Sequence, residues 1–209
     1  MTQTNSLSGL YAITDPCAGQ YDSLYQHVEA ALTGGTRILQ YRDKSHDTQR
    51  RQEEASTLRA LCRQHHCLFI INDDVTLAEQ VHADGVHIGK DDAALQQARQ
   101  QLGEQAIIGV SCYNNISLAL EAEAAGADYV AFGRFFPSAT KPDAIQAAPE
   151  LLTQAKTRLN VPVVAIGGIT LENGGQLIQH GADSLAVIQG VFGQPDIQKA
   201  AQRFTALFE

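Results

Sequence analysis

Short apolar runs alternate with helical patterns along the whole chain. The runs are rich in β-branched residues and are typical of strands that are buried on both faces of a parallel sheet. The predicted strands are Leu10–Ile13, Ile38–Tyr41, Leu68–Ile71, Gly85–Ile88, Ile107–Ser111, Tyr129–Phe132, Val163–Ile166 and Ser184–Ile188. Between them, apolar residues recur at spacings of three and four, as at Ala55, Leu58, Leu61 and Cys62, which predicts amphipathic helices.

Three of the predicted strands are preceded by the same short pattern. Each runs from a helix end through an acidic turn into an apolar strand, and these segments are Asp84–Gly89, Gly126–Gly133 and Gly181–Ile188, with Gly34–Gln40 as a looser fourth copy. A recurring strand–helix unit predicts a single α/β domain over residues 1–209, and eight such units fit a TIM (β/α)8 barrel. An open doubly wound sheet is the alternative, because periodicity does not establish closure. In both architectures the chemistry belongs at the carboxyl ends of the strands.

Composition narrows the classes of function. The chain has 209 residues, 44% hydrophobic content and a net charge of −8, which argues against general nucleic-acid binding. No apolar run approaches membrane-spanning length and no signal peptide is readable at the amino terminus, so a cytoplasmic protein without membrane partners is expected. The four cysteines form no Cys-x-x-Cys pair and are expected to be structural thiols.

The second predicted strand ends in a run of polar residues. Gln40, Arg42 and Lys44 follow Ile38 and Leu39 at alternating positions, and side chains two apart on a strand point the same way. An amide, a guanidinium and an ammonium on one side predict a site for a phosphorylated ligand. Charged residues that merely mark the start of a loop are the alternative, which is weakened because other strand exits also carry reactive groups.

Acidic residues follow the third and fourth predicted strands. Asp73 and Asp92 would lie close together there, and two carboxylates about 4 Å apart repel by roughly 4 kcal/mol at an effective dielectric near 20. Mg²⁺ reverses that repulsion and prefers a few carboxylates together with substrate phosphate oxygens. Helix capping is the alternative role: Asp74 suits it, while for Asp92 capping and metal binding stay open, with Asp91 as a rival ligand.

The remaining exits add hydroxyls, an ammonium and glycines. Ser111 ends the fifth strand, and the segment Ser138–Lys141 after the sixth could wrap phosphate oxygens. The pairs Gly167–Gly168 and Gln189–Gly190 are typical of the paired barrel loops that bind phosphate through backbone N–H groups. The histidines form neither a zinc motif nor a recognisable dyad, and Cys112 has no base visible nearby in the sequence.

Six segments, in order and at barrel spacing, resemble the thiamine phosphate synthase family over nearly the whole chain. They are Gln40–Lys44, Ile71–Asp74, Ala83–Asp92, Gly109–Ser111, Pro137–Lys141 and Ala165–Ile169. The resemblance implies a Mg²⁺-dependent transferase that joins 4-amino-2-methyl-5-hydroxymethylpyrimidine diphosphate to 4-methyl-5-(2-phosphoethyl)thiazole, or to its carboxylated form. The products are thiamine phosphate and diphosphate.

The resemblance also implies roles for individual residues. Catalysis falls to Lys141, Arg42 and Ser111, and Asp73 and Asp92 bind the metal. The pyrimidine diphosphate is contacted by Gln40, Tyr41, Arg42, Asp43, Lys44, Asn72, Ser111 and Lys141. The thiazole phosphate is contacted by Ser138, Ala139, Thr140, Gly168, Ile188 and Gln189. Ser138 stands where threonine is common in the family, and Gln189 where serine is common.

Two other functions compete with the synthase. A thiazole tautomerase, a related barrel, would need neither Arg42 and Lys44 nor the Asp73–Asp92 pair. A catalytically silent phosphate-binding barrel that acts as a regulator is the non-enzyme alternative. The expected partners are two phosphorylated small molecules, and a homodimer is an expectation that no motif tests.

Overall fold

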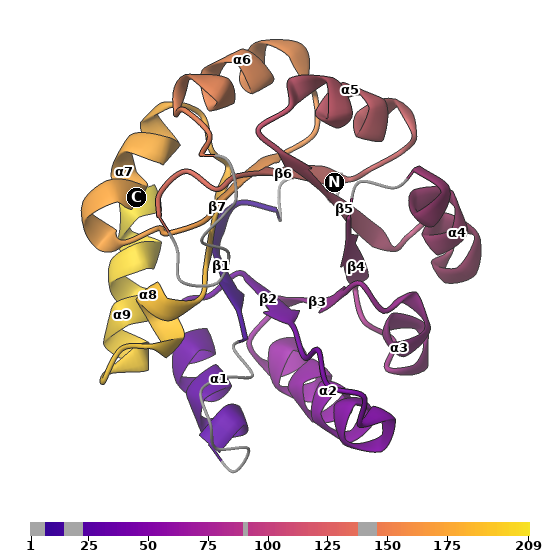
Figure 1. The fold of residues 1–209 in the computed structure, drawn as a ribbon. Helices are drawn as coiled ribbons and strands as arrows, with labels where there is room; N and C mark the ends of the chain where they lie inside the picture. The colour runs from indigo at the N-terminus through magenta and orange to yellow at the C-terminus, as the bar shows by residue number, and fades with distance from the viewer. Residues whose placement is uncertain (1–6, 15–22, 90–91, 138–145) are drawn as a thin grey trace.

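The protein is a closed barrel of parallel strands surrounded by helices. The computed structural model describes residues 7–14, 23–89, 92–137 and 146–209, the side chains of residues 92 and 93 excepted. The strands close in the order β1-β2-β3-β4-β5-β6-β7-β8 (Figure 1). This confirms the TIM barrel and rules out the open sheet.

The strands lie where the apolar runs predict them. They are β1 (Gly9–Ile13), β2 (Ile38–Tyr41), β3 (Leu68–Asn72), β4 (Gly85–Ile88), β5 (Ile107–Tyr113), β6 (Tyr129–Phe132), β7 (Val163–Ile166) and β8 (Ser184–Val187). Strand β8 ends one residue earlier than predicted, because Ile188 becomes the residue before a short helix.

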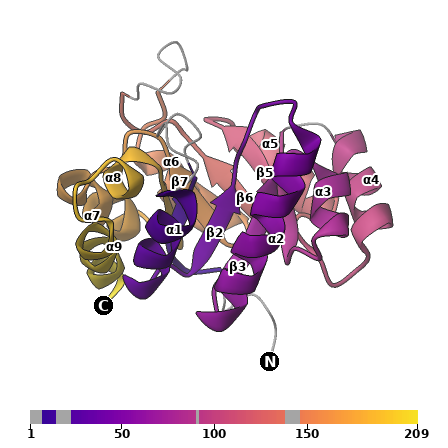
Figure 2. The ribbon, with the colours of Figure 1, turned by 90° about the horizontal axis from the view of Figure 1, so that it is seen from below.

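Helices follow the strands and form the outer layer, which Figure 2 shows from the side. They are α1 (Leu24–Thr33), α2 (Thr48–Gln64), α3 (Val75–Gln80), α4 (Asp92–Leu102), α5 (Ile116–Ala124), α6 (Glu150–Arg158), α7 (Leu171–Gln179), α8 (Gln189–Phe192) and α9 (Ile197–Thr205), with a final 3₁₀ turn at Ala206–Phe208. Asp74, Asn115 and Thr170 cap the starts of α3, α5 and α7. None of these described helices has the length and apolar character needed to cross a bilayer.

Side chains of alternating strand positions fill two separate apolar layers. One layer lies inside the barrel and includes Tyr11, Ile38 and Tyr129. The other lies between strands and helices and includes Leu39 and Tyr41. Since Ile38 faces the interior, Gln40 two residues later faces it as well, and it is only 3% exposed. The strand pattern therefore determines which polar groups enter the barrel.

The repeated aspartates have a structural role at the opposite end of the strands. Each accepts a hydrogen bond from a backbone N–H of the preceding strand and pairs with a basic side chain of the helix that comes before that strand. The contacts are Asp84 with Phe69 N and Arg59, Asp128 with Ile108 N and Arg99, and Asp183 with Val163 N and Lys156. The repeat that predicts the barrel therefore joins neighbouring units to one another.

Candidate active site

The carboxyl ends of neighbouring strands are tied together at one rim. The Thr14 N–H donates to Gln40 O at 3.0 Å, which joins the ends of β1 and β2. Asn72 pairs with His87 in the β3–β4 register, and the Asp73 N–H donates to His87 O at 2.8 Å. Because these exits are adjacent, the polar groups that follow them can act on one ligand.

A chain of buried hydrogen bonds crosses the barrel just below this rim. Gln40 Nε2 donates to Tyr11 Oη at 2.7 Å, and Tyr11 Oη lies 2.8 Å from Tyr129 Oη. Tyr129 Oη lies 3.0 Å from His87 Nδ1, and His87 Nε2 lies 2.9 Å from Ser111 Oγ. Two residues predicted for the pyrimidine site, Gln40 and Ser111, are thus the two ends of one polar chain.

The two tyrosines of this chain are held as neutral phenols. Burial raises the pKa of Tyr11, and it also raises the pKa of Tyr129. The rings of Tyr129 and His87 stack with centroids 5.6 Å apart, while Tyr11 meets Tyr129 edge-on at 6.1 Å. The two phenol groups of the chain are therefore uncharged and are held in place by ring packing.

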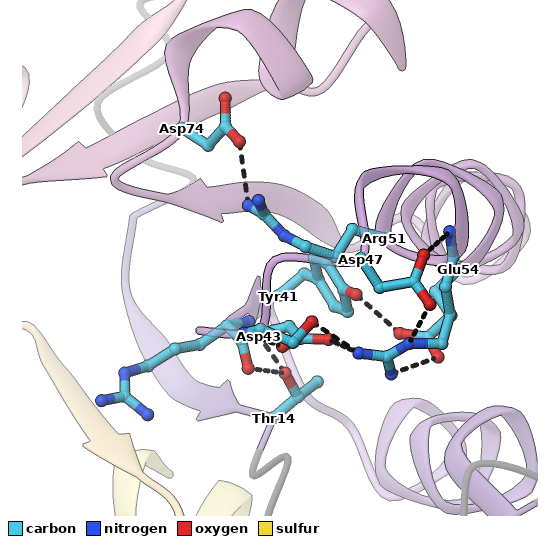
Figure 3. A network of polar contacts seen from close by, with 10 residues as sticks. Thr14, Tyr41, Asp43, Asp47, Arg51, Glu54 and Asp74 are labelled. Atoms are coloured by element: carbon cyan, nitrogen blue, oxygen red, sulfur yellow. Dashed lines mark hydrogen bonds and ion pairs between the residues drawn. The ribbon is translucent and has the colours of Figure 1, made fainter.

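A second polar network holds the loop between β2 and α2 (Figure 3). Tyr41 Oη donates to Glu54 Oε2 at 2.6 Å, and Arg50 Nη2 donates to Asp43 Oδ2 at 2.6 Å. The side chain of Asp43 is 4% exposed and also accepts from Ser45 N. The structure therefore turns Tyr41 and Asp43 toward α2, where their side-chain oxygens bind protein groups.

The cations predicted at this exit lie on the loop that the network holds. The Arg42 N–H donates to Thr14 Oγ1 at 2.9 Å, and Thr14 is 2% exposed, so the backbone of Arg42 is attached to the end of β1. Lys44 is exposed two residues further on. Strand β2 ends at Tyr41, so its alternating pattern does not extend to Arg42 and Lys44. The hydrogen bonds of the loop position these two side chains instead.

Asp73 and Asp74 are neighbours with different surroundings. Asp74 caps α3 by accepting from Leu77 N at 2.9 Å, and its other oxygen accepts from Arg51 Nη2 at 2.9 Å (Figure 3). Asp73 is exposed, and its carboxylate accepts from the Asn72 amide at 2.7 Å. Its φ of 62° lies in the left-handed region, where Asp and Asn are the commonest side chains apart from glycine. The prediction that Asp74 is a capping residue is confirmed.

The surroundings of Asp73 fit a hard cation. An exposed carboxylate next to an amide oxygen offers the ligands that Mg²⁺ prefers, and the ion usually completes its shell with water and phosphate oxygens. Within the described part of the chain, no group of three or more His, Cys, Asp or Glu side chains could hold a metal. Asp92 begins α4, directly after the exit of β4, but its side chain lies outside the described set.

The loops after β7 and β8 lie side by side. Gly168 has a φ of +63°, and a Cβ atom there would lie 2.4 Å from Pro137 O, so only glycine fits. Ile188 immediately precedes α8, and Gln189 begins it. A Cβ atom on Gly190 would come within 3.0 Å of Ile169 O, which shows how closely the two loops approach. The predicted Ser138, Ala139, Thr140 and Lys141 lie outside the described residues.

Three residues of the candidate site are not apparent from the sequence: Tyr11, His87 and Tyr129. The sequence pattern presents the two tyrosines only as strand residues and His87 as a histidine without a motif. The available signal was alternation, because His87 lies two residues after Gly85 and Ser111 two after Gly109, which puts both polar side chains inside the barrel.

Comparison with known proteins gives consistent results. Residues 10–191 match the protein family described as thiamine monophosphate synthase. The chain is 51% identical to the thiamine-phosphate synthase of Thioalkalivibrio sulfidiphilus over 100% of both chains. It is 50% identical to that of Nitrosococcus oceani, over 98% of this chain and 94% of that protein. A solved structure, the thiamine phosphate pyrophosphorylase from Pyrococcus furiosus, superposes with a TM-score of 0.87 at 36% identity, covering 99% of this chain and 98% of that one.

Proposed function

Because this chain belongs to the thiamine monophosphate synthase family and is therefore a transferase, we propose that it makes thiamine phosphate from two fragments. One is 4-amino-2-methyl-5-hydroxymethylpyrimidine diphosphate, and the other is 4-methyl-5-(2-phosphoethyl)thiazole or its carboxylated form. The observation that carries this proposal is the hydrogen-bonded chain that joins Gln40 to Ser111 across the barrel, together with the Arg42 loop that directly follows Gln40. A ligand that carries both a base and a diphosphate needs neutral hydrogen-bonding groups for the base, such as Gln40 and Ser111, and cations for the diphosphate, such as Arg42.

The pyrimidine diphosphate would lie over the exits of β2 to β5. Gln40 and Ser111 would bind the base, while Arg42, Lys44, Asn72 and Lys141 would bind the diphosphate. Charge-assisted hydrogen bonds of this kind contribute about 1.5–3 kcal/mol each. Tyr41 and Asp43 would act indirectly, since their contacts with Glu54 and Arg50 hold the loop that carries the cations.

The metal would be held by Asp73 and Asp92 together with diphosphate oxygens. When bound, Mg²⁺ supplies positive charge that stabilises the departing diphosphate. Asn72 donates to Asp73 Oδ2 at 2.7 Å, which holds that carboxylate at the rim. Asp74, whose carboxylate already binds Leu77 N and Arg51, would remain outside the metal site.

The reaction would proceed by loss of diphosphate and then attack. The C–O bond breaks, its electron pair leaves with the diphosphate, and the aminopyrimidine delocalises the resulting carbocation. The thiazole nitrogen then donates its lone pair to form the new C–N bond. With the carboxylated fragment, the bond to the carboxylate also breaks, CO₂ leaves, and the electron pair left on the ring carbon takes up a proton from water. Arg42, Lys44 and Lys141 would stabilise the leaving group, and holding both fragments together replaces a bimolecular encounter.

The thiazole phosphate would bind at the loops after β7 and β8. Backbone N–H groups at Gly168, Ile188 and Gln189 would contact the phosphate, with Ser138, Ala139 and Thr140 closing the site from the β6 loop. A backbone contact does not depend on the side chain, so glutamine at 189 is compatible with this role.

A coupling assay tests the proposal. Purified protein is mixed with both fragments and Mg²⁺, and thiamine phosphate and diphosphate are quantified. We expect equal amounts of both products. Isomerisation of the thiazole phosphate without the pyrimidine would instead indicate a tautomerase, and tight binding without turnover a regulator; either result would overturn the proposal.

A further inference from the structure

The buried polar chain contains three residues to which the proposed reaction gives no role. Tyr11, Tyr129 and His87 connect Gln40 on β2 with Ser111 on β5, and Tyr129 is fully buried. A buried polar group costs stability unless it is hydrogen-bonded, so such a chain needs a reason to be present inside an otherwise apolar layer.

The direction of donation along the chain follows from its first bond. Gln40 Nε2 donates to Tyr11 Oη, so the single hydroxyl hydrogen of Tyr11 is available for Tyr129 Oη. The hydrogen of Tyr129 is then donated to His87 Nδ1. With every one of these hydrogens kept within the chain, His87 carries its own hydrogen on Nε2, and that nitrogen donates to Ser111 Oγ.

This direction determines what each end offers to a ligand. The Gln40 amide group uses Nε2 within the chain, so its Oε1 atom is an acceptor. Ser111 Oγ accepts from His87, so its own hydroxyl hydrogen is a donor. An acceptor on β2 and a donor on β5, joined across the barrel by this chain, are complementary to a ring edge that has an amino group beside an unprotonated nitrogen.

We propose that Tyr11, Tyr129 and His87 are positioning residues that fix Gln40 as an acceptor and Ser111 as a donor, so that the site selects a 4-aminopyrimidine over a 4-oxopyrimidine. This inference rests on the proposed function, because it takes the pyrimidine as the ligand of this rim. A 4-oxopyrimidine has a carbonyl and a ring N–H on the same edge, so it would present an acceptor to Gln40 and a donor to Ser111.

Two further observations support a chain of fixed geometry. Gly109 pairs with Tyr129 across β5 and β6, and a Cβ atom at Gly109 would lie 1.9 Å from Tyr129 Cζ, so the glycine makes room for this ring. Burial raises the pKa of both tyrosines, which keeps their hydroxyl hydrogens in place at neutral pH.

The first test reads the histidine tautomer in the free protein. In ¹⁵N NMR spectra at neutral pH, His87 is assigned by the signals that disappear in His87→Gln. We expect a neutral ring with hydrogen on Nε2 and a bare Nδ1. Hydrogen on Nδ1, alone or with Nε2, would reverse the direction of the chain and overturn the proposal. No substrate is needed, so failure here is distinct from failure of the coupling assay.

The second test measures selectivity by calorimetry, using the 4-amino and 4-oxo forms of 2-methyl-5-hydroxymethylpyrimidine phosphate as probes. We expect the full-length wild-type protein to prefer the 4-amino form by about 100-fold or more. In Tyr11→Phe the Gln40 amide loses its anchor, so binding of the 4-amino form should weaken about 10-fold and the preference should fall below about 10-fold. A purely structural role would weaken both forms equally.

Tyr25→Phe is the matched control, because Tyr25 is a half-buried tyrosine of α1 outside the chain. It should keep the wild-type preference. An unchanged preference in a folded Tyr11→Phe protein, or a loss of preference as large in Tyr25→Phe, would overturn the proposal. Urea unfolding of both variants establishes that each is folded.

Discussion

Gly109→Ala should destabilise the protein strongly, because the ring of Tyr129 occupies the space that a side chain at residue 109 would fill. A Cβ atom there would be 1.9 Å from Cζ and 2.3 Å from Cε1 of Tyr129, whereas carbon atoms in contact prefer about 3.5–4.0 Å. The ring therefore has to move by about 2 Å, and the ring itself is fully buried.

The size of the effect follows from two contributions. Overpacking in a core costs about 1–3 kcal/mol. Moving the ring also breaks the contacts of Tyr129 Oη with Tyr11 and His87, and leaving buried polar groups unsatisfied costs about 1–3 kcal/mol each. We expect the free energy of unfolding to fall by about 3–9 kcal/mol, a large part of the 5–15 kcal/mol that is usual for a folded protein.

Equilibrium urea unfolding measures this change, with Gly175→Ala as the control. Gly175 lies inside α7 with open space where a Cβ atom would be, so alanine there should stabilise by about 0.5–1 kcal/mol. A double-mutant cycle with Tyr129→Leu should show that Gly109→Ala costs less once the ring is gone. A loss below about 1 kcal/mol for Gly109→Ala, or strict additivity in the cycle, would refute the reasoning.

Three further predictions concern the β2–α2 loop and the thiols. Arg50→Ala should lower the free energy of unfolding, measured in urea, by about 2–4 kcal/mol, because it leaves the nearly buried carboxylates of Asp43 and Glu54 unpaired. Arg63→Ala, on the exposed side of the same helix, should change it by less than about 0.5 kcal/mol. Equal effects of the two substitutions would contradict this prediction. Burial alone would raise the pKa of Asp43, but hydrogen bonds from Ser45 and the charge of Arg50 outweigh burial and lower it. Its contribution to stability is therefore complete above the unfolded-state pKa of about 3.9 and lost as pH falls through the folded-state value, so Asp43→Asn should flatten the acid-side loss of stability in urea titrations; parallel curves for both proteins would exclude this cause. Burial raises the pKa of Cys112 to about 12, so mass spectrometry should find it unalkylated by iodoacetamide at neutral pH until the protein is unfolded, and labelling of the native protein would be inconsistent with its burial.

The barrel could be predicted because its signals are local and repeated. Strands such as Ile38–Tyr41 and Tyr129–Phe132 have the predicted bounds, since a short apolar run between helical patterns has few other uses. The recurring Asp84, Asp128 and Asp183 support the same prediction from the sequence alone. The structure adds their physical role, which is to accept hydrogen bonds from backbone N–H groups of the preceding strand.

The site was only partly predictable, because much of it depends on contacts between residues that are distant in sequence. Gln40 and Ser111 could be found from their positions at strand ends, but the hydrogen bond between Tyr11 and Tyr129 joins residues 118 positions apart. His87 has no motif, and its role appears only when β4 and β5 lie side by side. Likewise, the sequence Gln40–Lys44 does not show that the side chain of Asp43 binds Arg50 and does not face a ligand.

The central claim is that Asp73 belongs to the diphosphate and metal site while its neighbour Asp74 belongs to the fold. Asparagine is the matched change at both positions, because it tolerates the left-handed backbone of residue 73 and can still cap α3 at residue 74. The most direct measurement is the single-turnover rate of thiamine phosphate formation for both variants with saturating Mg²⁺. We expect Asp73→Asn to slow the reaction by on the order of 100-fold or more while its urea midpoint stays unchanged. Asp74→Asn should stay within about threefold of the wild-type rate and lose roughly 1 kcal/mol of stability with the weakened Arg51 pair. A wild-type rate in Asp73→Asn, or an equal loss of rate in both variants, would contradict the claim.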